Sequence, residues 1–138
     1  MTFHAYIFFS DGQCREALTH YQTIFGGDLD LMTNADLPED AEPMPGAAPE
    51  HIMHAALKVG DGMLMASDDP TGDGGPRLGV AISYSAPDEA TGRRTFEALA
   101  DGGEVQMPFE PTFWSSGFGA CVDRFGVSWM VDVLMPES

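Results

Sequence analysis

Residues 112–134 read TFWSSGFGACVDRFGVSWMVDVL, and this stretch decides the fold of the chain. Two apolar, aromatic-rich runs, Gly117–Val122 and Val127–Leu134, flank the segment Asp123–Gly126. Such runs around a short segment that contains glycine are typical of a β-hairpin, because glycine readily adopts the positive φ of a tight turn. The sequence therefore predicts two paired strands joined at Asp123–Gly126.

The second of these strands has two chemically different faces, because successive side chains along a strand point to opposite sides. The apolar face consists of Trp129, Val131 and Val133. The face that carries polar atoms consists of Ser128, Met130, Asp132 and Leu134.

A strand, a helix and a further strand precede this hairpin. Leu78–Tyr84 is strand-like, and Pro87 stands where a helix begins and its missing N–H does no harm. Gly102 and Gly103 end the helix, and Glu104–Met107 resembles a strand.

The first half of the chain repeats this order. The segment Phe3–Phe9 is strand-like, and Ser10–Gly12 is a helix-start signal. Apolar residues then recur at steps of three and four until Gly26 and Gly27, which predicts an amphipathic helix. Three more strands are predicted over Asp28–Thr33, His51–Val59 and Gly62–Asp68.

The repeat predicts two βαβββ modules, over residues 1–68 and 77–135, joined by a glycine-rich linker over 69–76. The alternative is a single sheet with unrelated halves. Asn34–Glu50 contains four prolines and five acidic residues without periodicity, so we expect an exposed loop that could act as a lid.

The composition points to one domain-sized, strongly acidic chain. Its 138 residues include 22 acidic and six basic side chains, for a net charge of -16. This charge repels phosphate backbones and anionic lipid, so we expect neither a nucleic-acid nor a membrane partner. Cys14 and Cys121 lack the spacing of a zinc or redox pair, and no secretion signal or spanning segment is found. Free thiols in the cytoplasm are the expectation.

Several motifs resemble the PhnB-like branch of the vicinal oxygen chelate superfamily, which includes glyoxalase I, bleomycin-resistance proteins and extradiol dioxygenases. The resemblance covers nearly the whole chain. It is carried by Phe8–Leu18, Tyr21, Phe25–Gly27, His51–Ala55, Met63–Asp68, Phe113-Trp114, Phe118-Gly119, Asp123–Val127 and Trp129-Met130. It implies an α+β fold in which two βαβββ modules form a curved, cup-like mixed sheet with helices on the outer side, usually in a dimer.

Enzymes of this superfamily hold a divalent metal with four residues, one from the first and one from the last strand of each module. By resemblance these positions fall on His4, Ala66, Gly79 or Val80, and Met130. Only the histidine suits a hard or borderline divalent ion, so we expect no metal and no other cofactor. His51 and His54 could support a different metal site, with carboxylates from Asp68, Asp69 and Asp132, but no H-E-x-x-H or C-x-x-C spacing makes that site specific.

The cup would be lined by one face of the strands. The candidate ligand-binding residues are His4, Tyr6, Phe8, Ser67, Trp114, Trp129 and Met130, with Met65 beside them. A shift of one residue would exchange the inward and outward sets. Trp129 and Met130 are equally well explained as core residues, and His4 either as an acid–base group of the pocket or as a satisfied strand histidine.

The first functional hypothesis is therefore a homodimeric small-molecule-binding protein that lacks the usual metal ligands. The second is a metal-dependent lyase, isomerase or dioxygenase of the glyoxalase type, and the third is an interaction role without a ligand. Nucleophilic catalysis is poorly supported, because Cys14 has no evident base. The stretch Gly72–Gly75 opens no helix, so a nucleotide-binding turn of the methyltransferase kind is not expected there.

Overall fold

The computed structural model describes residues 3–38, 48–70 and 79–134. The chain divides into two compact units, Met1–Gly75 and Pro76–Ser138. Most of the predicted lid, residues 39–47, and most of the predicted linker, residues 71–76, lie outside the described residues.

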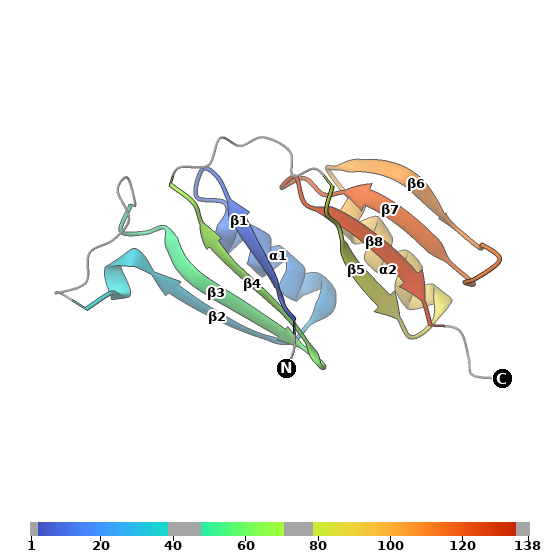
Figure 1. Ribbon diagram of the computed structural model, residues 1–138, viewed down its shortest axis with the longest axis horizontal. Helices are drawn as coiled ribbons and strands as arrows, with labels where there is room; N and C mark the ends of the chain where they lie inside the picture. Colours follow the sequence, from blue (N-terminus) through green and yellow to red (C-terminus); the bar gives the residue numbers. More distant parts are fainter. Residues whose placement is uncertain (1–2, 39–47, 71–78, 135–138) are drawn as a thin grey trace. The chain divides into compact units, whose positions relative to one another are not determined.

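The first unit is a four-stranded sheet with one helix on it (Figure 1). The strands follow the order β1-β4-β3-β2, with β1 parallel to β4 and the other pairs antiparallel. Between helix and sheet lies a buried core that includes Phe9, Leu18, Tyr21 and Leu57. The elements are β1 (Ala5–Phe9), α1 (Cys14–Phe25), β2 (Asp28–Thr33), the 3-10 turn η1 (Asn34–Asp36), β3 (Ile52–Val59) and β4 (Gly62–Asp68).

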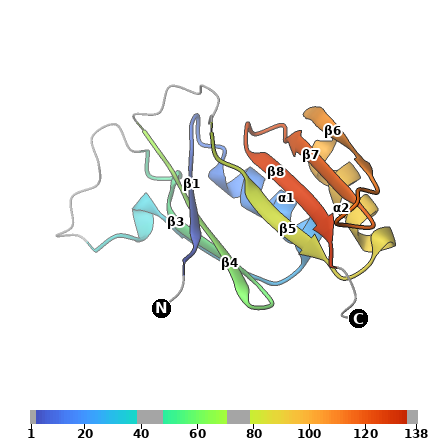
Figure 2. The ribbon, with the colours of Figure 1, turned by 45° about the vertical axis from the view of Figure 1, so that its right-hand side comes forward.

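The second unit has the same topology, with strand order β5-β8-β7-β6 and one helix against the sheet (Figure 2). β5 is parallel to β8, as β1 is to β4. The elements are β5 (Ile82–Ala86), α2 (Glu89–Ala100), β6 (Glu104–Glu110), β7 (Phe118–Val122) and β8 (Ser128–Val133). The prediction of two βαβββ modules is confirmed, and the alternative of unrelated halves is wrong.

The predicted hairpin is confirmed, and a buried carboxylate holds its turn. Gly126 has a φ of 85°. Asp123 Oδ1 accepts hydrogen bonds from the backbone N–H of Phe125 at 2.9 Å and of Val127 at 3.0 Å. Its Oδ2 accepts one from the indole Nε1 of Trp129 at 2.9 Å. The turn and the start of β8 are therefore tied to one side chain.

The helix starts differ from the prediction. Gln13, and not the Ser10–Gly12 segment, is the N-cap of α1, and it makes no side-chain cap bond. Instead Asp68, at the end of β4, accepts from the N–H of Cys14 at 2.9 Å and from that of Ile52 at 2.7 Å. In α2 the cap is Asp88, whose side chain accepts from Thr91 N at 2.7 Å, so Pro87 lies just before the helix rather than inside it.

Two strand boundaries in the second unit also differ. β5 begins at Ile82 and continues to Ala86, later than the predicted Leu78–Tyr84. β6 continues to Glu110, past the predicted end at Met107. Its register with β7 shifts twice, and the second shift, between Met107 and Glu110, spans Pro108, a residue without an N–H to donate.

The two modules can be matched residue by residue from their hydrogen bonds. Asp69 N donates to Phe9 O, and Leu134 N donates to Ala86 O, at the same place in each parallel strand pair. Counting back along β4 and β8 from these bonds makes Ser67 the equivalent of Asp132, and Met65 the equivalent of Met130. The turns differ in length: Val59 pairs with Gly62 in the first unit, but Val122 pairs with Ser128 in the second. The resemblance placed Ala66 and Met130 at equivalent positions, and each lies four residues after a turn glycine, Gly62 or Gly126. Because the turns differ in length, this equivalence is wrong by one residue.

Candidate functional site

Each sheet has one face covered by its own helix and one face that this helix leaves open. Side-chain alternation assigns the residues to these faces, and the burial pattern agrees with it. We call the open face of the first unit face 1 and that of the second unit face 2. Face 1 includes Tyr6, Phe8, His54, Met65 and Ser67. Face 2 includes Ser83, Ser85, Phe118, Met130 and Asp132.

Face 1 carries a cluster of aromatic rings with a polar centre. The Tyr6 hydroxyl is hydrogen-bonded to His54 Nδ1 at 3.2 Å. The Tyr6 ring lies 5.1 Å from the ring of Phe8 and 5.8 Å from that of His54, measured between centroids. Tyr6 is 40% exposed and Phe8 56% exposed, so both rings present apolar surface. The cluster can stack on a flat molecule while a hydroxyl and an imidazole orient it.

The remaining candidates of the first unit lie near this cluster. Ser67 is buried and pairs with Phe8 across the parallel strands, on the same face. His4 is exposed and comes one residue before β1. Sequence reasoning proposed Tyr6, Phe8 and Ser67 together, and the structure places them side by side. It did not single out His54 for this face, although the alternation of β3 could have suggested it.

Face 2 combines hydroxyls, a carboxylate and aromatic rings. Ser83 pairs with Met130, and both Ser85 and Phe118 pair with Asp132, which lies between them on the central strand β8. The Trp114 ring meets that of Phe118 edge to face, with centroids 5.6 Å apart. Trp114 is 47% exposed, and its backbone N–H donates to the Thr112 hydroxyl. Of the two predicted residues, Trp114 therefore contacts face 2 through Phe118, and Met130 lies on face 2 two residues before Asp132.

Asp132 has an unusual environment. Its Oδ1 is buried and accepts no hydrogen bond from the described residues. Buried polar atoms in folded proteins nearly always have a partner, and an exception is commonly explained by a water, an ion or a ligand. Sequence reasoning placed Asp132 on the face of Met130 but did not name it among the ligand-binding residues.

Trp129 does not belong with the other candidates. It is 2% exposed, lies on the helix-covered face beside Cys121, and donates its indole N–H to Asp123. Because neighbouring residues of a strand face opposite ways, Trp129 and Met130 cannot line the same surface. The structure places Met130 on face 2 and Trp129 in the core.

The two cysteines are buried free thiols, as expected. Burial, with a smaller contribution from Asp68, raises the pKa of Cys14 to about 12. Burial, with a smaller contribution from Asp123, raises the pKa of Cys121 to about 11. Both thiols stay protonated at neutral pH, and a protonated thiol is a weak nucleophile.

The residues at the superfamily's metal positions do not fit a divalent ion. In the last strands, the equivalent residues Met65 and Met130 offer only soft thioethers, and Ala66, the position that the resemblance implied, is buried on the helix-covered face of β4 without a donor. Within either unit, no three His, Cys, Asp or Glu side chains of the described residues gather as metal ligands. We therefore derive no chemical step through a metal.

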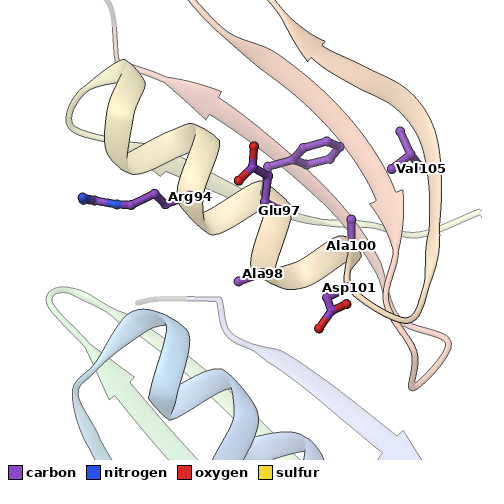
Figure 3. Close-up of a pocket in the computed structure, with 7 residues that line it drawn as sticks. Arg94, Glu97, Ala98, Ala100, Asp101 and Val105 are labelled. Atoms are coloured by element: carbon purple, nitrogen blue, oxygen red, sulfur yellow. The ribbon is translucent and has the colours of Figure 1, made fainter.

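A hollow of about 550 Å³ lies beside the C-terminal half of α2, on the helix-covered side of the second sheet (Figure 3). It is wide and open, and its charged groups belong to exposed side chains. The hollow is lined by Arg94, Phe96, Glu97, Ala98, Ala100, Asp101 and Val105. It contains no histidine, thiol or hydroxyl, so it offers less chemistry than either open face.

The chain belongs to the glyoxalase/bleomycin resistance protein/dioxygenase superfamily, whose profile matches residues 4–131. Among solved structures, protein PA1353 from Pseudomonas aeruginosa is 42% identical, with a TM-score of 0.84 over 96% of this chain and 97% of that one. The protein YjdN of Escherichia coli (strain K12) is 28% identical over 134 residues, 91% of each chain. The PhnB protein of Bacillus cereus is 20% identical, with a TM-score of 0.77 over 97% of this chain and all of that one, which shows a shared fold. None of the helices within the described ranges is long and apolar enough to cross a membrane.

Proposed function

We propose that this protein is a PhnB-like member of the superfamily that binds a small aromatic or apolar molecule without the usual metal. The observation that carries the proposal is the cluster on face 1, where the hydrogen-bonded pair Tyr6 and His54 stands beside the exposed ring of Phe8. Exposed aromatic surface next to a few convergent polar atoms is typical of ligand sites. The motifs of the PhnB-like branch and the fold shared with the Bacillus cereus protein support the branch.

The cluster is suited to binding because its parts hold one another in place. The bond between Tyr6 and His54 joins β1 to β3, two strands separated by β4. A hydroxyl fixed in this way loses less conformational entropy when a ligand arrives than a freely rotating one. Phe8 extends the apolar surface along β1.

The test is a thermal-shift screen of aromatic and apolar metabolites, followed by calorimetric titration of the hits. A ligand that binds only the native state raises the melting temperature. We expect Phe8→Leu to weaken binding about fivefold, because an aromatic contact is worth roughly 1 kcal/mol beyond its area. Phe3→Leu is the matched control, since Phe3 is 95% exposed and precedes β1. The proposal fails when no compound stabilises the protein, or when both variants bind as tightly as the unchanged chain.

The metal-free part of the proposal has its own test. Protein purified without a histidine tag and dialysed against buffer is analysed for transition metals. We expect far less than one metal per chain, because the donor set at the family positions is poor. A stoichiometric metal retained through dialysis would instead support the glyoxalase-type enzyme.

We also propose that the protein is a cytoplasmic homodimer. The dimer is implied by the family resemblance, and two unpaired buried thiols suit a reducing compartment. Sedimentation equilibrium on the full chain tests the dimer, and a single species with the mass of one chain would exclude it.

A further inference from the structure

We infer that face 2 recognises a protonated amine, held between the Asp132 carboxylate and the rings of Phe118 and Trp114. The inference goes beyond the proposed function, whose evidence lies on face 1, and assigns a class of ligand to the open face of the other unit. It starts from Asp132 Oδ1, a buried acceptor without a donor among the described residues.

The surroundings of Asp132 favour a cation over other donors. Phe118 is its direct cross-strand neighbour, so the ring and the carboxylate lie on the same side of the sheet about 5 Å apart at their Cβ atoms. Trp114 stands edge to face on Phe118 and is half exposed. Aromatic faces attract ammonium groups, and a carboxylate adds a charge-assisted hydrogen bond. The hydroxyl-bearing Ser85 borders Asp132 on its other side.

An arriving amine can reach the carboxylate at low cost. Rotation about the terminal torsion of an aspartate is soft, since that torsion joins an sp³ to an sp² atom. Such a rotation exchanges the two equivalent oxygens, and Oδ1 makes no hydrogen bond with the described residues that the rotation would break. The net charge of -16 also concentrates cations and repels anions around the whole chain.

The experiment uses three probes of similar shape: 2-phenylethylammonium, 2-phenylethanol and phenylacetate. The full chain carries ¹³C-methyl methionine, so that Met130 reports on face 2 and Met65 on face 1. We expect the Met130 signal to move with the ammonium at a Kd at least fivefold below that of the alcohol, and to move least with phenylacetate. Raising the salt concentration should weaken the binding of the ammonium but not that of the alcohol.

Two variants locate the effect. Asp132→Asn keeps the size of the side chain and should bring the ammonium and the alcohol within twofold of each other. Asp101→Asn removes the same charge from an exposed position of the same unit and should keep the fivefold preference. Equal binding of all three probes by the unchanged chain overturns the inference, and this result does not depend on whether Asp132→Asn folds. A preference for the ammonium that persists in Asp132→Asn also overturns it. A Met130 signal that moves equally with the alcohol and the ammonium would contradict amine recognition on face 2. A Met65 signal that moves with any of the three probes would leave the proposed function on face 1 standing.

Discussion

Single buried side chains hold several backbone groups in place in this molecule, and Asp123 is the clearest example. It is buried, and its two oxygens accept hydrogen bonds from two backbone N–H groups of the turn and from the Trp129 indole. A carboxylate in this position replaces the water that these donors would lose on folding. The same bond explains why Trp129 is a core residue and not part of a ligand site.

We expect Asp123→Ala to lower the free energy of unfolding by about 3 kcal/mol, because three donors lose their acceptor in a buried place. Urea unfolding followed by tryptophan fluorescence measures this. Asp61→Ala is the matched control, since Asp61 is an exposed aspartate in the shorter turn between β3 and β4. A loss of less than about 0.5 kcal/mol, within the usual range of surface substitutions, would contradict this role of Asp123.

At the scale of elements, the first unit depends on Asp68 to join a helix and two strands. Its carboxylate, at the end of β4, accepts from the first N–H of α1 and from the first N–H of β3. A negative charge at a helix N-terminus is also favoured by the helix dipole. In the second unit the N-terminus of α2 is capped by Asp88, the residue that directly precedes the helix. The two modules thus share a topology but not a cap.

Asp68→Ala should lower the free energy of unfolding by about 2 kcal/mol, since it leaves two backbone donors without their acceptor. Hydrogen exchange should accelerate at the amides of Cys14 and Ile52 in particular. Asp30→Ala, an exposed position on β2, is the control and should leave both amides protected. Unchanged exchange at Cys14 and Ile52 in Asp68→Ala would show that the carboxylate is dispensable there.

At the scale of the whole molecule, the charge is the dominant property. The chain carries 22 acidic residues against six basic ones. The ion pair of Arg93 with Glu89, at 3.4 Å, joins two exposed side chains and contributes little. Self-repulsion of like charges opposes the compact state, and salt screens it.

The melting temperature should therefore rise by several degrees between about 0.01 and 0.3 M sodium chloride, over which the Debye length falls several-fold. Differential scanning calorimetry measures the change, with an equal osmolarity of sorbitol as the control. A melting temperature that salt leaves unchanged, or lowers, would mean that the acidic side chains are too far apart to repel one another.

What could be predicted from the sequence follows from local rules. Alternation along residues 128–134 separates Trp129 from Met130, glycine marks the turn at Gly126, and the repeated order of elements predicts two βαβββ modules. The first two signals lie within a few residues of the features that they describe, and the repeat compares elements that are each marked locally.

Only the tertiary structure decided which residues meet. The turn before β8 is longer than the turn before β4, so Met65, and not Ala66, corresponds to Met130. The cap of α1 comes from Asp68, 54 residues along the chain, and Tyr6 meets His54 across an intervening strand. Strand register and contacts across a sheet depend on side chains distant in sequence, so a local pattern determines the faces of each strand but not the neighbours that each face acquires.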